Sequence, residues 1–122
     1  MITGFGGATI WSEDLNKQLL PFYRDLLGMP VGHQSEAFVV LGQPGGSTPV
    51  LSLGTHSEVL GRNLDPARHM VGLMSDDVRA DCARLKGKGV EFVEDPTDYG
   101  TLRIATLKDP EGNLVQLFQR LG

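Results

Sequence analysis

Two short segments of the chain share one pattern, and this internal repeat narrows the possible folds more than any other feature. GATIWSEDL runs from Gly7 to Leu15, and MVGLMSDDV runs from Met70 to Val78. Each segment has the pattern of a strand that leads into an acidic helix start. Because each half of the chain is too small to bury a stable core by itself, the repeat predicts two copies of one unit that pack together.

A helix is predicted directly after each copy of the repeat. In the first half, one helical face carries the apolar residues Leu15, Leu19, Phe22 and Leu26. In the second half, the same spacing gives Val78, Cys82 and Leu85. Both helices are therefore predicted to bury one apolar stripe.

The helix ends are predicted from residue types that cap helices. Asp14 and Asp77 are plausible N-caps. Glycines are plausible stops, at Gly28 in the first half and at Gly87 or Gly89 in the second. Pro21 lacks a backbone donor and clashes with a preceding helical turn, so we expect the first helix to kink there or to begin properly only near it.

Three strands are predicted after each helix, at residues 29–34, 37–41 and 48–53 in the first half and 90–94, 101–107 and 114–119 in the second. GQPGGS connects two of the first three strands, and Asp109-Pro110-Glu111-Gly112 has the pattern of a turn before the last strand. Each unit is thus βαβββ, and the fold class is α+β. We expect a single domain, 1–122, made of module 1–55 and module 68–122 joined by 56–67.

Composition indicates an ordinary soluble domain. The chain has 122 residues, 40% of them hydrophobic, with a net charge of −4 and 11 Lys and Arg that form no block. A nucleic-acid partner is therefore not expected, and no apolar run is long enough to predict a membrane partner. MITGFGGATI has no basic region followed by an apolar stretch, so no signal peptide is expected. With Cys82 as its single cysteine, the chain is expected in the cytoplasm.

The paired βαβββ unit resembles the vicinal oxygen chelate superfamily, which includes glyoxalase I, extradiol dioxygenases, fosfomycin-resistance transferases and bleomycin-resistance proteins. FYRDLLG after the first helix start and DPEGNLVQL near the end carry the resemblance, which covers nearly the whole chain. It implies two curved mixed sheets that face each other around a pocket. It also implies four strands that point ligands, typically His, Glu or Gln, at one divalent metal.

The residues at the implied metal positions are unusual for that family. Counting back from each helix start places Gly7 and Met70 at the first position of each module, and the other two fall at or near Ser52 and at Gln116. Glycine offers no side chain and a thioether suits hard divalent cations poorly. We therefore expect no metal cofactor. A divalent metal is the alternative, and it would require His69, one residue off register, to turn inward beside Gln116.

The same faces of the implied strands give a candidate ligand pocket. Strand alternation groups Thr9 and Trp11 with Gly7, Met74 with Met70, and Phe118 with Gln116. The expected ligand-binding residues are Thr9, Trp11, Ser52, Met70, Met74, Arg103, Gln116 and Phe118. Gly7 and Gly72 either leave room in this pocket or allow close strand packing. Arg103 either clamps an anionic group of the ligand or is a solvated strand residue.

The expected function is a metal-independent protein of the bleomycin-resistance type that binds a small aromatic molecule, as a homodimer, without converting it. Trp11 would stack on a ring while Gln116 and Ser52 orient the ligand. The alternative is a metal-dependent lyase, isomerase or dioxygenase, with ligands recruited from His69, His33, His56 or Glu36. A regulatory module whose cup is filled by core side chains is the third hypothesis.

Overall fold

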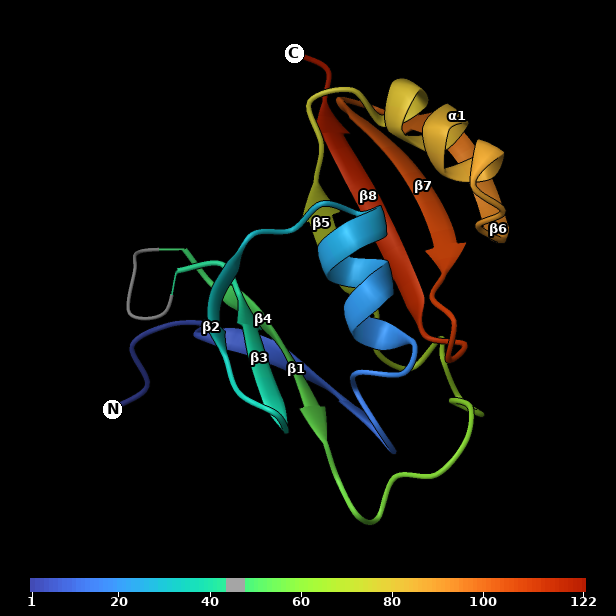
Figure 1. Ribbon diagram of the computed structural model, residues 1–122. Helices are drawn as coiled ribbons and strands as arrows, with labels where there is room; N and C mark the ends of the chain where they lie inside the picture. Colours follow the sequence, from blue (N-terminus) through green and yellow to red (C-terminus); the bar gives the residue numbers. More distant parts are fainter. Residues whose placement is uncertain (44–47) are drawn as a thin grey trace. The chain divides into compact units, whose positions relative to one another are not determined.

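The computed structural model describes residues 1–43 and 48–122, and these divide into two compact units, Met1–Gly61 and Arg62–Gly122 (Figure 1). Residues 44–47, which include most of the glycine-rich loop expected between two strands, lie outside the described part. Each unit consists of a four-stranded mixed sheet and one helix. The predicted α+β class with a βαβββ order in each unit is confirmed.

The first unit orders its strands β1-β4-β3-β2. β1 pairs with β4 in parallel, and the other two pairings are antiparallel. The predicted strand bounds shift by a few residues at most. The elements of this unit are β1 (Gly7–Ser12), η1 (Pro21–Leu26), β2 (Val31–Gln34), β3 (Phe38–Leu41) and β4 (Val50–Thr55).

The second unit repeats this topology with the order β5-β8-β7-β6, again with a parallel pair, β5 and β8, at one side. Helix α1 packs against β6, β7 and β8 (Figure 1). The strand predicted at residues 90–94 is too short, because β6 continues through two register irregularities to Tyr99. The elements are β5 (Val71–Met74), α1 (Val78–Gly87), β6 (Phe92–Tyr99), β7 (Leu102–Lys108) and β8 (Leu114–Arg120).

The first helix begins as an ordered helix only near Pro21, as the proline predicts. It is a wide, π-type segment in which Leu27 N–H donates to the Phe22 carbonyl, five residues back, at 2.9 Å. The prediction that Asp14 is its N-cap is wrong. The Asp14 carboxylate instead accepts from Asn16 N–H in a turn that precedes the helix.

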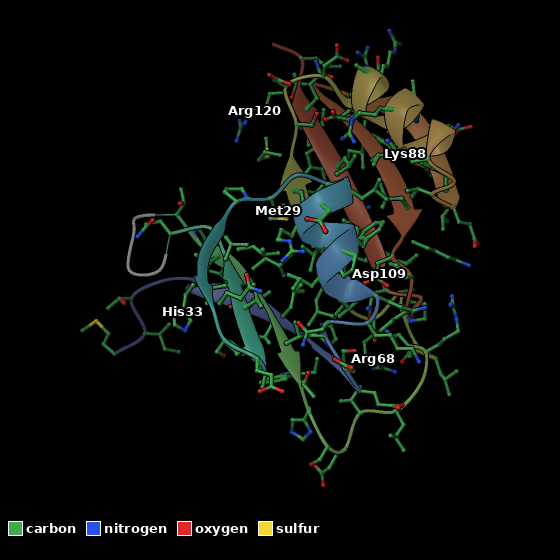
Figure 2. The ribbon with its side chains drawn as sticks, viewed as in Figure 1. Met29, His33, Arg68, Lys88, Asp109 and Arg120 are labelled. Atoms are coloured by element: carbon green, nitrogen blue, oxygen red, sulfur yellow. The ribbon has the colours of Figure 1, made fainter. Side chains whose placement is uncertain are left out.

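In the second unit the local predictions from capping residues are confirmed. Asp77 is the N-cap of α1, and its carboxylate accepts from Ala80 N–H at 3.0 Å. Asp109, 3% exposed, closes the turn before β8 by accepting from the N–H groups of Glu111 and Asn113 (Figure 2). Gly112 follows with φ of +83°, the left-handed conformation that glycine adopts freely. These bonds explain why Asp109, Gly112 and Asn113 act together as one turn.

The internal repeat extends to individual hydrogen bonds. In the first unit, Leu15 N–H donates to Thr55 Oγ1 at 3.0 Å. At the same place in the second unit, Val78 N–H donates to Gln119 Oε1 at 3.0 Å. In both units, therefore, a side chain from the last strand accepts from the backbone at the start of the helical segment. The two copies of the sequence pattern thus build the same tertiary contact with different residues.

Gly7 is needed because two backbones approach closely there. A Cβ atom at this position would lie 2.5 Å from the Val50 carbonyl oxygen on the paired strand, a distance that real Cβ atoms do not show. Backbone cannot move away as a side chain can. Of the two sequence hypotheses for Gly7, close strand packing is therefore the one that the structure supports.

Across the described residues, no helix is long and apolar enough to cross a membrane.

Replacing Thr55 with valine tests the tertiary contact that both units share. Valine keeps the shape of the side chain but leaves Leu15 N–H, which belongs to a fully buried residue, without its acceptor. The free energy of unfolding is expected to fall by about 1–3 kcal/mol, measured by urea denaturation. Thr101→Val is the matched control, because Thr101 is exposed and makes no side-chain hydrogen bond within the described residues. Equal effects of the two substitutions would contradict the assignment.

Candidate functional site

The sheet of the second unit has two unlike faces. α1 covers the face of Ala105, Leu107, Val115 and Leu117, which are all buried, and Lys86 of α1 lies over the Phe92 ring on this side. The other face carries Gln116, Thr106 and Phe118, and we call it the Gln116 face. Since α1 does not cover it, the Gln116 face is the side on which this unit could bind a ligand.

Gln116 is half-buried at the middle of its face. Its cross-strand neighbours are Gly72 on β5 and Thr106 on β7. Its Nε2 donates to Thr106 Oγ1 at 3.4 Å, a long hydrogen bond, and this is the only hydrogen bond of the amide group within the described residues. Gln116 is thus partly satisfied by its own sheet, and the amide oxygen remains able to accept from a ligand.

Phe118 fills the space above Gly72. A Cβ atom at Gly72 would lie 2.3 Å from Cε2 of the Phe118 ring. The sequence hypothesis that Gly72 leaves room for a ligand is therefore wrong, because the glycine accommodates an aromatic ring of its own sheet. Met74, which is opposite Phe118, is 65% exposed, and Met70 precedes β5 and is 42% exposed. Both methionines remain accessible apolar groups.

The corresponding face of the first unit is built around Trp11. Thr9 and Ser52 are opposite each other on β1 and β4, as the predicted grouping requires, and Ser52 is only 6% exposed. The Trp11 ring lies over Gly54, where a Cβ atom would come within 2.3 Å of it. Trp11 is nevertheless 44% exposed, so one part of the indole packs on the sheet and another part remains free. We call this surface the Trp11 face.

Two residues that the sequence analysis did not place beside Trp11 pack against its ring. The Phe38 ring on β3 lies 6.0 Å from the indole, and the His56 ring lies 5.4 Å away in an edge-on arrangement. His56 Nδ1 accepts from Glu58 N–H at 3.0 Å, so Nε2 carries the proton in the neutral imidazole. Strand alternation could not group His56 with Trp11, because His56 lies just beyond the end of β4.

Arg103 is not on the Gln116 face. Arg103 and Thr106 are three residues apart on β7, so their side chains leave the sheet on opposite sides. Arg103 therefore points to the side that α1 covers. Its guanidinium forms two hydrogen bonds to the Asp98 carboxylate, at 2.7 and 3.1 Å. This pairing lowers the pKa of Asp98, chiefly through the hydrogen bonds. The structure therefore does not bring Arg103 together with Gln116, and the guanidinium already has a carboxylate partner.

The histidines considered as alternative metal ligands are dispersed. His69 is exposed and precedes β5. His33 lies on β2 opposite Val40, also exposed (Figure 2). Among residues 1–43 and 48–122, no group of three or more His, Cys, Asp and Glu side chains is arranged to hold a metal ion.

The residues at the family's metal positions do not fit a divalent cation. In the first unit, Gly7 has no donor and the remaining position offers the Ser52 hydroxyl. In the second unit, the donors are the Met70 thioether and the neutral Gln116 amide. Hard cations select carboxylate, carbonyl and water oxygens, transition metals such as zinc also accept imidazole, and zinc sites use at least three strong protein ligands. Neither half supplies a strong ligand at these positions.

One carboxylate does share the Gln116 face. Glu94 on β6 is half-buried and lies opposite Thr106, which in turn lies opposite Gln116. Tyr99 Oη lies 3.0 Å from both carboxylate oxygens of Glu94. This hydrogen bond raises the pKa of Tyr99, with smaller contributions from desolvation and from the negative charge.

Cys82 takes no part in either face. It is 2% exposed on the buried side of α1, and burial raises the pKa of its thiol to about 11. A thiol in this state is a poor nucleophile at neutral pH.

The chain matches the model of the Glyoxalase/Bleomycin resistance protein/Dioxygenase superfamily over residues 6–117. It belongs to this superfamily, as the vicinal oxygen chelate resemblance predicts.

Relatives within the superfamily carry different names. A lactoylglutathione lyase from Neisseria meningitidis serogroup A is 32% identical over 111 residues, covering 83% of this chain and 80% of the relative. A probable lactoylglutathione lyase from Synechocystis sp. is 32% identical over 120 residues, with 87% of each chain covered. The crystal structure of TnmS3, an antibiotic binding protein from Streptomyces sp. CB03234, superposes with a TM-score of 0.67 at 25% identity, covering 98% of both chains.

The Tyr99–Glu94 pair predicts a measurable titration. Ionised Tyr99 could not donate to the carboxylate and would be repelled by it, so the proton is held more tightly than in a free phenol. Glu94→Gln removes the negative charge, and the pKa of Tyr99 is expected to fall toward its ordinary value in an ultraviolet titration of tyrosinate. The chain has two tyrosines, and Tyr23 is fully buried, so Tyr99→Phe identifies the signal. An unshifted titration in Glu94→Gln would contradict the pair.

Proposed function

We propose that this protein is a metal-independent binding protein for a small aromatic molecule. The observation that carries the proposal is Trp11, a large aromatic side chain that is 44% exposed yet fixed over Gly54. Exposed indoles that are held rigidly offer a stacking surface at low entropic cost, since little side-chain freedom remains to be lost on binding.

Polar groups near the centre of each face would orient the ligand through hydrogen bonds. On the Trp11 face these are the Thr9 and Ser52 hydroxyls, and on the Gln116 face they are the amide and the Thr106 hydroxyl. A few polar groups among apolar side chains are typical of small-molecule sites. The poor fit of these residues to a divalent cation supports ligand binding without a metal, and the likeness to an antibiotic binding protein supports a binding role.

Further parts of the proposal concern the state of the protein. We propose a cytoplasmic homodimer whose partner is a small molecule and not nucleic acid or a membrane. The net charge of −4, without a basic block, supports the exclusion of nucleic acid.

Binding is measured by titrating planar aromatic compounds against the fluorescence of Trp11, the single tryptophan. For a compound that binds, calorimetry then compares variants. Trp11→Ala is expected to weaken a compound that binds the Trp11 face about tenfold or more through lost stacking, and Gln116→Ala is expected to weaken a compound that binds the Gln116 face about three- to tenfold, the worth of one hydrogen bond. Gln18→Ala, an exposed glutamine next to the first helix, is the matched control. Unchanged affinity in both site variants would overturn the assignment of the faces.

The competing function is a metal-dependent lyase, and the two lactoylglutathione lyase relatives at 32% identity favour it. Metal analysis of protein purified without chelator separates the two. The proposal predicts substoichiometric divalent metal and no change in ligand affinity after dialysis against EDTA. A stoichiometric ion, lost in His69→Ala, would favour the lyase and contradict metal independence.

A further inference from the structure

We propose that Glu94, held by Tyr99, makes the Gln116 face selective for aromatic ligands that carry a cationic amine. The inference rests on the proposed function and adds the chemical class of the ligand. It arises from the sheet register, which brings a carboxylate into the row of Gln116.

The row runs across three strands. Glu94 on β6, Thr106 on β7 and Gln116 on β8 are successive cross-strand partners, so their side chains leave the sheet on the same side. Neighbouring strands lie about 5 Å apart, which separates Glu94 from Gln116 by roughly 10 Å. A bicyclic aromatic molecule with a one-carbon arm has this length.

The carboxylate is oriented before any ligand arrives. Tyr99 lies opposite Leu102, on the same side of the sheet as Thr106, and its hydroxyl proton is shared between the two oxygens of Glu94. A carboxylate has about four acceptor positions, so most of them remain for a ligand. A charged hydrogen bond to an oriented acceptor is stronger than one between neutral groups.

The other charges of this sheet are either paired or distant. Lys108 forms an ion pair with Glu91 at 3.0 Å. Arg120 lies at the far end of β8, four residues from Gln116 and thus about 13 Å along the strand. Arg103 pairs with Asp98 on the face that α1 covers. Among the described residues of this unit, the centre of the Gln116 face therefore has the negative charge of Glu94 without an unpaired cation nearby.

This charge selects among ligands of similar shape. The apolar part of a ligand would contact Phe118, Ile104 and Met74, which share the face. An ammonium group beside Glu94 would gain a charged hydrogen bond, whereas a carboxylate there would be repelled. The face is thus expected to bind aromatic amines and to reject aromatic acids.

Three probes that share a naphthalene ring and a methylene arm test the inference in the intact protein: 2-naphthylmethylamine, 2-naphthylmethanol and the anion of 2-naphthaleneacetic acid. Affinities measured by calorimetry at pH 7 are expected to fall in that order, with the amine about tenfold tighter than the alcohol. In Glu94→Gln the amine is expected to lose this advantage. Tyr99→Phe is expected to lose part of it, because the carboxylate is still present but less well oriented.

Asp76→Asn is the matched control, since it removes one negative charge from an exposed position of the same unit without taking the partner away from Lys108. It is expected to keep the preference for the amine, and circular dichroism checks that each variant is folded. Equal binding of amine and alcohol by the native protein, tighter binding of the acid, or a preference that survives in Glu94→Gln would each overturn the inference alone. Failure of all three probes to bind would instead contradict the proposed aromatic binding function.

Discussion

The parallel pairing of the first and last strand in each unit determines what the rest of the chain can do. A parallel pair needs a long crossover connection, and here the connection contains the helix, which in the second unit packs on one side of its sheet. The other side of that sheet is then not covered by α1. The pairing also fixes which residues meet there, placing Thr9 opposite Ser52 and Gly72 opposite Gln116. The repeat in the sequence reflects this constraint, because each copy forms the first strand of its unit and the start of the crossover connection.

Both units also pack an aromatic ring over a glycine of the neighbouring strand. The ring lies on the first strand in one unit and on the last strand in the other. In the first unit Trp11 on β1 lies over Gly54 of β4, and in the second Phe118 on β8 lies over Gly72 of β5. In each case a ring of the same sheet fills the space that a side chain at the glycine would occupy, so the glycine leaves no hollow. A glycine on a binding face is therefore evidence for a neighbouring aromatic group as much as for ligand space, and the ring it supports becomes the apolar surface that a ligand would meet.

Local signals predicted most of the fold, although Asp14 is not the N-cap expected from its residue type, and the site residues were assigned wrongly where register depends on distant strands. Asp77 caps α1 as expected because a cap involves only neighbouring residues. Glu94 could not be assigned to the Gln116 face by counting, since two register irregularities in β6 interrupt the alternation. Arg103 was grouped with the ligand residues because its face depends on how β7 pairs with β8, which the sequence does not show. The contact between His56 and Trp11 was not predicted, because His56 lies beyond the end of its strand.

Sequence identity of 32% to lactoylglutathione lyases and a donor set unsuited to metal are compatible, because different residues determine fold and activity. The turn bonds of Asp109, the cap at Asp77 and the buried apolar faces maintain the superfamily fold, and they are needed whatever the protein binds. In the proposed function, binding depends on a few side chains of the Trp11 and Gln116 faces, which carry an amide, hydroxyls and Glu94. Neutral groups can hold an organic molecule by hydrogen bonds without the desolvation cost of several buried carboxylates. In the proposed function, the single carboxylate of this face would still distinguish ligands by their charge.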